Sequence, residues 1–372
     1  MKKLKVVTIV GTRPEIIRLS EVIRKLRRTV DHVLVHTGQN YDYELNQIFF
    51  DDLQLAPPER ILDVKGSSLG ELFGRILAGV EPILVEERPD AVLILGDTNS
   101  SIAGIMARRH KIPLFHMEAG NRCFDDNVPE EINRRIIDHI SDVNLPYTEN
   151  SRRYLLAEGC PRDRVFVTGS PMREVLAANM QRIQASSVLG ELGLTEGSYF
   201  LVSMHREENV DREEHLKELL AALEGLATRY GLPVIVSTHP RTRKRLDALG
   251  AATDPLIRFC KPFSFTSYVR LQMAARCTLS DSGTISEESA MLGFPAVTIR
   301  EAIERPEALD AGSILMTGID KEHILSCVEV AMAGGKPECP PDYKVENTSE
   351  RVLRIILGYV QYVNRRVWLK QD

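Results

Sequence analysis

The sequence predicts an α/β protein made of two doubly wound, Rossmann-like domains. The chain has 372 residues, which is longer than one hydrophobic core usually organises. Short apolar, β-branched runs alternate with helical stretches, and this order of strand, turn and helix restarts near residue 199. Because strands that alternate with helices are typical of parallel sheets with right-handed crossovers, each half is expected to form one such sheet.

The elements of the first half follow from its apolar runs. A continuous β-branched run at 4–10 predicts a strand buried on both faces. Thr12 and Glu15 have the spacing of a capping box around Pro14, which predicts a helix over 12–28. Further strands are expected at 32–37, 91–95, 113–117, 143–146 and 165–168, and helices at 69–88, at 101–110 and from 129 onward.

The last of these helices carries an apolar stripe of Ile132, Ile136 and Ile140 at helical spacing. This stripe is expected to face inward. Glu130 lies in the first turn, where the helix dipole favours a carboxylate, and it shares the opposite face with Arg134. These two charged residues are therefore expected to face either solvent or a cleft.

The second half repeats the pattern of the first. Its strands are expected at 199–203, 233–237, 256–259, 277–280 and 295–299, and its helices at 215–230 and 267–275. We expect domains at 1–168 and 169–348, divided at a Gly-Ser-Pro tripeptide, and a terminal helix within 349–372 that packs across a domain surface. The two domains are expected to face one another across a cleft lined by the carboxyl ends of their strands, where ligands of α/β proteins bind.

The composition indicates a soluble, cytoplasmic protein without a nucleic-acid or membrane partner. The net charge is −5, and no long basic run provides a footprint for nucleic acid. Six scattered cysteines without a C-x-x-C pair are typical of reduced thiols. No apolar run approaches the ~18 residues that span a membrane, and the short N-terminal run lacks a cleavage site.

Several cofactor and catalytic signatures are absent from the sequence. There is no H-E-x-x-H or similar metal-ligand spacing, so no metal site is expected. The first strand-to-helix turn lacks G-x-G-x-x-G, which argues against a classical nicotinamide site. The phosphate-binding loop G-x-x-x-x-G-K-[ST] and the nucleophile elbow G-x-S-x-G are also missing, so P-loop and α/β-hydrolase functions are excluded.

Carboxylates at two predicted strand ends form the first candidate site. Asp97 and Glu118 each stand where a buried-looking strand ends. Asp97 is either a helix-capping residue or a functional one. A glutamate at position 118 has no evident role in helix capping and is interpreted as functional. Glu130 and Arg134, four residues apart, are either a surface ion pair or part of the same site.

Two loops that open helices are candidate phosphate sites. The segments G-T-R-P-E at 11–15 and D-S-G-T at 281–284 each follow a strand and begin a helix, where backbone N–H groups and the helix dipole favour an anion. Arg13 can complete the first site, and simple helix capping is the alternative for both segments. His205 and His239 lie beside arginines at equivalent strand ends of the second half, which suits diphosphate or sugar contacts.

Together these motifs resemble the non-hydrolysing UDP-N-acetylglucosamine 2-epimerase family. The residues that carry the resemblance are G-T-R-P-E at 11–15, G-D-T at 96–98, H-M-E-A-G at 116–120, P-E-E-I-N-R at 129–134, H-R-E at 205–207, D-S-G-T-I-S-E-E at 281–288 and E-R-P-E-A at 304–308. They lie in the family's order over nearly the whole chain. The resemblance implies GT-B-like domains, a UDP-activated 2-acetamido sugar in the cleft between them, no cofactor and a homodimer.

The resemblance also implies a reaction. C2 of a 2-acetamido sugar has no adjacent carbonyl group, so its proton cannot leave to form an ordinary enolate. The family eliminates UDP to form a 2-acetamidoglycal and adds UDP back after protonation of the other face, which requires acid/base carboxylates and stabilisation of the departing diphosphate. The implied catalytic residues are Asp97, Glu118, Glu130 and His205, and which carboxylate removes the proton is left open. The implied substrate contacts are Arg13, Arg18, Gln39, Arg122, Arg134, His239, Ser282, Gly283, Thr284, Glu288 and Arg305.

Within the family, the segment 119–139 most resembles the branch that converts UDP-2-acetamido-2,6-dideoxy-L-talose into UDP-N-acetyl-L-fucosamine for surface polysaccharides. UDP-N-acetylglucosamine 2-epimerases more often have leucine in place of Asn121 and lysine in place of Arg18. The segment 37–43 also departs from a pattern that helps to bind an activating second sugar nucleotide in bacterial members.

Four alternatives to this assignment remain open. Two are sibling epimerases, acting on UDP-N-acetylglucosamine and UDP-N-acetylmannosamine or on a 2,3-diacetamido uronate. The third is a GT-B glycosyltransferase, which would share the fold and the UDP site but transfer the sugar to an acceptor. The fourth is a non-catalytic UDP-sugar sensor, which would leave the clustered acid/base residues unexplained.

Overall fold

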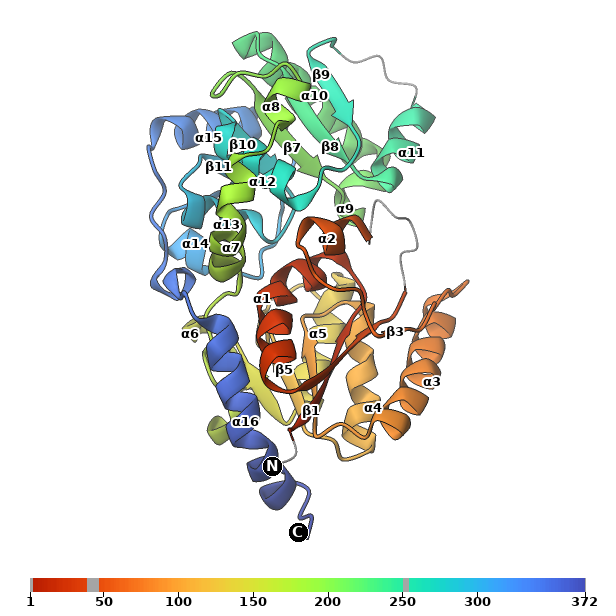
Figure 1. The fold of residues 1–372 in the computed structure, drawn as a ribbon. Coiled ribbons are helices and arrows are strands. Elements are labelled where there is room, and N and C mark those ends of the chain that lie inside the picture. Colours follow the sequence, from red (N-terminus) through yellow and green to blue (C-terminus); the bar gives the residue numbers. More distant parts are fainter. Residues whose placement is uncertain (1–2, 39–46, 250–253, 372) are drawn as a thin grey trace. The chain divides into compact units, whose positions relative to one another are not determined.

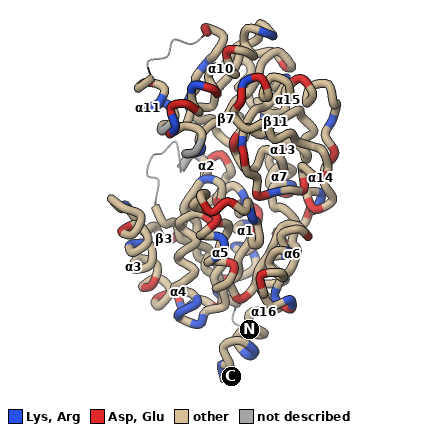
Figure 2. Tube along the Cα trace, turned by 180° about the vertical axis from the view of Figure 1, so that it is seen from behind, with Lys and Arg blue, Asp and Glu red and all other residues tan. Residues whose placement is uncertain are grey.

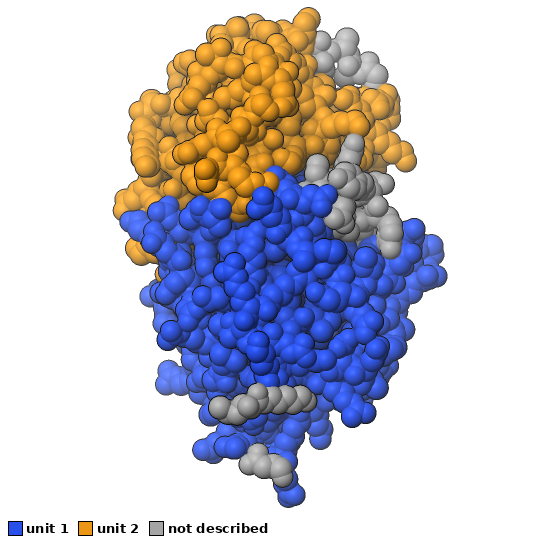
Figure 3. All heavy atoms as spheres, in the orientation of Figure 1, with its two compact units in different colours: residues 1–178, 344–372 blue, residues 179–343 orange. Residues whose placement is uncertain are grey.

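The computed structural model describes residues 3–38, 47–249 and 254–371, which fold into two compact units (Figures 1 and 3). Unit 1 consists of Met1–Ala178 and Lys344–Asp372, and unit 2 of Asn179–Tyr343. Each unit contains a six-stranded sheet, and the strand pairs of the described residues are parallel. The prediction of two doubly wound α/β domains is confirmed, and their placement across a cleft stays a prediction.

The sheet of unit 1 has the strand order β3-β2-β1-β4-β5-β6. Its strands are β1 (Lys5–Val10), β2 (Asp31–His36), β3 (Arg60–Ile61), β4 (Ala91–Leu95), β5 (Leu114–Met117) and β6 (Val143–Leu145). Its helices are α1 (Arg13–Thr29), α2 (Gln47–Asp52), α3 (Leu69–Glu87), η2 (Asn99–Ala103), α4 (Gly104–Arg109), α5 (Pro129–Ile140), α6 (Glu149–Ala157), η3 (Arg162–Arg164) and α16 (Thr348–Arg366). The central strands β1 and β4 are almost entirely buried, as expected for apolar strands covered on both faces.

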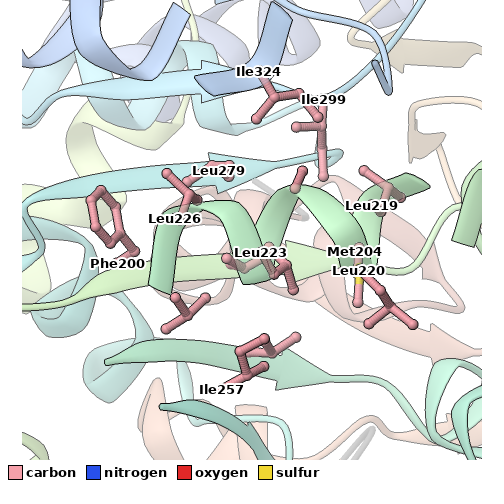
Figure 4. Close-up of a cluster of buried hydrophobic side chains, with 14 of the residues drawn as sticks. Phe200, Met204, Leu219, Leu220, Leu223, Leu226, Ile257, Leu279, Ile299 and Ile324 are labelled. Carbon is pink, nitrogen blue, oxygen red and sulfur yellow. The ribbon is translucent and has the colours of Figure 1, made fainter. Parts of the chain in front are cut away.

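The sheet of unit 2 has the strand order β12-β11-β10-β7-β8-β9. Its strands are β7 (Phe200–Met204), β8 (Val234–Thr238), β9 (Ile257–Cys260), β10 (Cys277–Ser280), β11 (Ala296–Thr298) and β12 (Leu315–Met316). Its helices are α8 (Val188–Glu191), α9 (Glu207–Val210), α10 (Glu213–Tyr230), α11 (Pro240–Leu249), α12 (Phe265–Ala274), α13 (Ile285–Leu292), α14 (Glu307–Asp310) and α15 (Lys321–Ala333). The core between α10 and the sheet includes Phe200, Leu223, Leu226 and Leu279 (Figure 4).

The prediction for the apolar stripe of α5 is wrong for two of its three members. Ile140 packs against the core of unit 1, but Ile132 and Ile136 are 55% and 39% exposed. The helix instead buries Glu131 and Arg134, which form ion pairs with one another and with polar groups at the strand ends. The buried face of α5 therefore combines this charged pairing with Ile137, which is fully buried in the core of unit 1.

The boundary between the units differs from the expected one. The strand predicted at 165–168 is reduced to an isolated bridge between Asn144 and Val165. At the start of α16, the Thr348 hydroxyl lies 3.3 Å from the carbonyl oxygen of Thr168 and 3.2 Å from that of Ser170. The Gly-Ser-Pro tripeptide that was expected to divide the domains therefore belongs to unit 1. The division falls inside α7 (Met172–Gln184) and η4 (Pro341–Lys344), and α16 packs against α1 within unit 1.

Acidic and basic residues are interspersed along both units (Figure 2). None of the helices in the described ranges combines the length and the apolar character needed to cross a membrane. Within the same ranges, no group of three or more His, Cys, Asp or Glu side chains is arranged to hold a metal ion.

Candidate active site

Each sheet contains one point where the strand order reverses, and the candidate residues follow the strands on either side of it. In unit 1 this point lies between β1 and β4, whose following loops carry Arg13 and Asp97. In unit 2 it lies between β10 and β7, which are followed by Ser282 and His205. Because the loops beyond such a point diverge and leave a crevice, both sets occupy the usual ligand position of an open α/β sheet.

Glu118 follows β5 in a backbone conformation that side-chain-bearing residues rarely adopt, with a φ of 66°. Its side chain is 6% exposed, and its Oε2 forms an ion pair with Nη1 of Arg18. Its Oε1 accepts a hydrogen bond of 3.4 Å from Nδ2 of Asn121, whose Oδ1 accepts one of 3.0 Å from the hydroxyl of Ser151. Because Ser151 binds the oxygen of the amide, the Asn121 NH2 group is directed at the Glu118 carboxylate.

Asp97 lies at the end of the neighbouring strand, after a turn made at Gly96 with a φ of 71°. One oxygen of Asp97, Oδ2, accepts hydrogen bonds from Nε and Nη2 of Arg134 at 2.9 and 2.5 Å. A Cβ built at Gly96 would lie 3.9 Å from Cδ of Glu118, so the two carboxylates belong to one neighbourhood. The Asp97 side chain retains 19% exposure, whereas that of Arg134 is 4% exposed.

Helix α5 contributes two glutamates from its first turn. Glu130 is partly buried, and Glu131 is fully buried. Burial opposes ionisation of Glu131, but hydrogen bonds from the backbone N–H and the thiol of Cys123, together with Arg134, hold the pKa of its carboxyl below the usual value. Nη1 of Arg134 donates to Oε2 of the negatively charged Glu131 at 2.8 Å. The other two nitrogens of Arg134 donate to Asp97.

Arg122, expected to contact substrate, is instead enclosed in a charge quartet with His116, Asp138 and Glu158. Its Nε and Nη2 donate to Glu158 at 2.8 and 2.5 Å, and its Nη1 donates to Asp138 at 2.7 Å. Its side chain is completely buried, and the contacts that the structure shows for it are with these protein groups. Its contact with substrate stays a prediction.

His116 joins this quartet to the loop that bears Asp97. Its Nδ1 lies 2.9 Å from Oδ1 of Asp138, and its Nε2 lies 2.9 Å from the carbonyl oxygen of Gly96. Both ring nitrogens therefore face an oxygen acceptor, and the ring connects the Asp138 carboxylate to the backbone of the Asp97 loop. Burial opposes ionisation of Asp138, but His116 and Arg122 hold the pKa of this carboxyl below its usual value.

The loop after β1 is packed closely against its neighbours. A Cβ at Gly11 would lie 2.3 Å from Oγ1 of Thr37 and 2.7 Å from Cβ of Ser100, so only glycine fits. Arg13 is partly buried, with its guanidinium 5.4 Å from the centre of the Phe49 ring. Gln39, which was predicted to contact the sugar, lies outside the described residues.

In unit 2, His205 is held by Asp281, which is fully buried at the end of β10. Oδ2 of Asp281 accepts the backbone N–H groups of His205 and Arg206 at 2.8 and 2.9 Å, and Oδ1 lies 2.8 Å from Nδ1 of His205. Burial opposes the charge, but His205 and these donors lower the pKa of Asp281 to about 2. The ring is 34% exposed, and because Nδ1 is held, Nε2 is the nitrogen that a ligand can reach.

The loop before α13 consists of small residues, and charged side chains pack against it. The hydroxyls of Ser282 and Thr284 are 2.9 Å apart, and a Cβ at Gly283 would lie 2.6 Å from Oε1 of Glu304. Arg305 is 4% exposed, and it donates to the carbonyl oxygen of Gly283. Arg305 was predicted to contact substrate, and the structure places it beneath the loop as a support.

Two further predicted contacts lie on neighbouring elements of unit 2. Glu288, in α13, is 6% exposed, and its Oε2 accepts a hydrogen bond of 2.7 Å from Nε2 of Gln272 in α12. His239 is partly buried between β8 and α11. Both residues therefore lie at the side of the sheet that carries His205 and the α13 loop.

Sequence reasoning gave no role to Asp138 or Glu158, and it treated Asp281 only as part of a candidate phosphate loop. Asp138 could have been recognised from the sequence, since Glu131, Arg134 and Asp138 recur at the spacing of one helix face. The other two act through partners that are 36 and 76 residues away in the chain, which no local pattern reveals.

Comparison with known proteins identifies the class of this site. A sequence model described as UDP-N-acetylglucosamine 2-epimerase matches residues 24–357. A Methanocaldococcus jannaschii UDP-N-acetylglucosamine 2-epimerase is 35% identical over 96% of this chain and 100% of its own. A Pseudomonas aeruginosa UDP-2,3-diacetamido-2,3-dideoxy-D-glucuronate 2-epimerase is 32% identical over 88% of this chain and 92% of its own.

Solved structures give the same result. A UDP-N-acetylglucosamine 2-epimerase from Rickettsia bellii has a TM-score of 0.92 and 49% identity, and the match covers 99% of this chain and 100% of that one. The M. jannaschii enzyme in complex with UDP-GlcNAc and UDP has a TM-score of 0.89 and 35% identity over 95% and 100% of the two chains. A glycosyltransferase from Rickettsia africae, at 11% identity and a TM-score of 0.55 over 98% and 100%, shares the fold alone.

Proposed function

The chain belongs to the UDP-N-acetylglucosamine 2-epimerase family and is a UDP-sugar 2-epimerase, and we propose that it converts UDP-2-acetamido-2,6-dideoxy-L-talose into UDP-N-acetyl-L-fucosamine. The observation that carries this choice of sugar is the amide of Asn121, which contacts Glu118 where related UDP-N-acetylglucosamine enzymes more often have leucine. A polar group in this place changes the hydrogen-bonding surface that the sugar meets. The product would serve surface polysaccharide synthesis.

We propose that the carboxylates Asp97, Glu118 and Glu130 perform the proton transfers at C2. Elimination removes the C2 proton and the UDP leaving group together, and the resulting glycal takes up a proton on the opposite face before UDP returns. Two of these carboxylates form ion pairs with arginines, Glu118 with Arg18 and Asp97 with Arg134, and a carboxylate is the kind of group that can accept the C2 proton. Arg134 has its nitrogens directed at Asp97 and Glu131, so we assign it to positioning rather than to the diphosphate.

We propose that the departing diphosphate is stabilised from the two loops at the reversal points. Arg13 follows β1, and Ser282 and His205 follow β10 and β7. Nε2 of His205 can donate to a phosphate oxygen while Asp281 keeps the ring oriented. Glu288 is assigned to the ribose hydroxyls, since a carboxylate accepts hydrogen bonds from a diol.

The test is transfer of solvent deuterium to C2. The purified protein is incubated in deuterated water with the L-talose and L-fucosamine nucleotides and, in parallel, with UDP-N-acetylglucosamine. We expect C2 labelling and interconversion of the two L-sugar nucleotides. An absence of both label and epimer from the L-sugars would overturn the choice of substrate, and an absence with every sugar would overturn the assigned chemistry.

The second candidate is interconversion of UDP-N-acetylglucosamine and UDP-N-acetylmannosamine. It is favoured by the names of the similar proteins from M. jannaschii and R. bellii. Faster labelling of UDP-N-acetylglucosamine than of the L-sugars in the same assay would select it. The P. aeruginosa relative makes a diacetamido uronate a third sugar to include.

We also propose that the protein is a homodimer. The support is the outer face of α5, where Ile132 and Ile136 are exposed, together with Phe124 in the preceding loop, which is 66% exposed. A second copy of the chain would cover this apolar surface. Sedimentation of the wild-type chain and of the Ile136→Glu variant tests this, since the variant should sediment as a monomer if the face is buried in a dimer.

A further inference from the structure

Glu15 is a buried carboxylate that none of the assigned steps uses. It lies in the first turn of α1 and is 1% exposed. Its Oε2 accepts hydrogen bonds from the backbone N–H of Gly11 at 3.0 Å and from the hydroxyl of Thr12 at 2.8 Å. Its Oε1 accepts a hydrogen bond of 2.5 Å from the hydroxyl of Ser100. One side chain therefore binds segments that are 85 residues apart.

The two segments are the loops on either side of the strand-order reversal in unit 1. Gly11 and Thr12 precede Arg13 after β1, and Ser100 belongs to the segment that follows Asp97 after β4. The hydroxyl of Thr98, the residue next to Asp97, lies 2.5 Å from that of Ser100. A chain of hydrogen bonds thus runs from the backbone beside Asp97 to the backbone beside Arg13, with Glu15 as its only charged member among the described contacts.

We propose that Glu15 is a positioning residue that ties these two loops together, so that the diphosphate contact at Arg13 and the proton-transfer group at Asp97 keep a fixed separation. The roles of Arg13 and Asp97 in this statement rest on the proposed function. The tie itself rests on three hydrogen bonds to one buried carboxylate. A displacement of about 1 Å between reacting groups can cost on the order of 100-fold in rate, which is the reason such a tie matters.

The donors around Glu15 explain why its ionised form is the one that ties both loops. The N–H of Gly11 cannot turn away, and the hydroxyls of Thr12 and Ser100 donate to the same carboxylate. Protonation of Glu15 places a hydrogen on one of its carboxyl oxygens, and the donor that binds this oxygen must then be displaced. Burial raises the pKa of Glu15 to about 6, against the opposing effect of the Ser100, Thr12 and Gly11 donors. The tie is therefore complete above about pH 6 and loosens below it.

Other charged and titratable groups lie on the elements packed around Glu15. They are Arg13 and Arg18 on α1, Asp97 on the loop after β4, and His36 at the end of β2. A pH effect has to be assigned to Glu15 by substitution, because an ordinary histidine side chain titrates in a similar range. Gln at position 15 serves this purpose: its oxygen can accept from Gly11 while its NH2 donates to Ser100, whose hydroxyl then turns toward Thr98.

The test compares Glu15→Gln, Glu15→Ala and Ser100→Ala, with Glu21→Gln as the matched control. Glu21 lies on the same helix, and it pairs with Arg24. The first readout is hydrogen–deuterium exchange of the backbone at pH 7.5, which needs no substrate. We expect peptides covering 11–15 and 97–103 to exchange faster together in Glu15→Ala, the second alone to do so in Ser100→Ala, and neither to do so in the control. Unchanged exchange of 97–103 in Glu15→Ala would overturn the tie.

The second readout is the pH dependence of C2 labelling. We expect Glu15→Ala to lower kcat on the order of 100-fold with a smaller change in KM. The wild-type enzyme should lose activity as the pH falls through about 6, and the Glu15→Gln variant should not show this loss. If the activity of Glu15→Gln still falls below about pH 6, another group causes this loss, and its assignment to Glu15 is overturned. If the wild-type enzyme labels no sugar, the proposed function fails, while the exchange experiment still decides whether the tie exists.

Discussion

The replacement Asp281→Asn tests the support of the His205 loop, and its cost can be worked out in advance. Asn is nearly isosteric with a protonated aspartate, so the variant reproduces the neutral acid at every pH. The difference between the ordinary carboxyl pKa of 3.8 and a pKa of about 2 corresponds to about 2 kcal/mol of folding free energy. Because the folded-state pKa is depressed, this contribution is present above about pH 4 and is lost as the pH falls toward 2.

The assay is urea unfolding of wild type and Asp281→Asn at pH 7, 5 and 3, followed by far-ultraviolet circular dichroism. Trp368, the single tryptophan, lies in unit 1, so its fluorescence gives an internal control that the variant should leave unchanged. We expect the variant to be about 2 kcal/mol less stable at pH 7, with a difference that shrinks toward pH 3. Equal stability at pH 7, or a difference that does not depend on pH, would refute the reasoning.

Three further predictions concern unit 1. Asp97→Asn should lower C2 labelling by about 100- to 10,000-fold, as expected for loss of an acid/base group, while calorimetry shows UDP binding retained. Arg122→Met should cost about 3–5 kcal/mol, measured by Trp368 fluorescence, because the buried Asp138 loses its arginine partner and keeps only His116. Gly120→Ala should destabilise unit 1 far more than Gly159→Ala: both have left-handed backbones, but only a Cβ at 120 meets a backbone atom, at 2.3 Å.

Each of these predictions has an outcome that contradicts it. Wild-type labelling by Asp97→Asn would remove this residue from the acid/base group and would favour a glycosyltransferase. A fully stable Arg122→Met that binds UDP poorly would restore Arg122 to the substrate contacts. Equal destabilisation by the two glycine replacements would mean that backbone strain, rather than the close approach of α6, sets the cost at position 120.

The sequence was sufficient to predict where most of the strands end and hence which candidate residues follow them. Asp97 and Glu118 were found because apolar runs define strand ends, and strand ends in parallel sheets define ligand positions. The inward face of α5 could not be found in this way. An apolar stripe at helical spacing predicts burial, but this helix buries Glu131 and Arg134 beside Ile137 and exposes Ile132 and Ile136, because Arg134 binds Asp97 in another part of the chain. Local periodicity contains no information about such partners.

The same limit applies to the roles of individual arginines. Arg13, Arg122, Arg134 and Arg305 look alike in the sequence, each close to a motif that suits an anion. In the structure Arg122 and Arg305 are enclosed by carboxylates and carbonyl groups, and Arg134 is directed at Asp97. Whether an arginine binds a ligand or the protein depends on pairings across 16 to 37 residues, which only the folded chain brings together.

The charge quartet has a consequence for how this protein can change in evolution or by design. The side chains of His116, Arg122 and Asp138 are completely buried, whereas that of Glu158 is 29% exposed, so only Glu158 connects this group to solvent. Replacement of Arg122 alone by an uncharged residue leaves the Asp138 carboxylate buried without its arginine, whereas replacement of Arg122 together with Asp138 removes both charges. Arg122 and Asp138 should therefore vary as a pair, and a graft of this active site onto another scaffold would need to transfer both together.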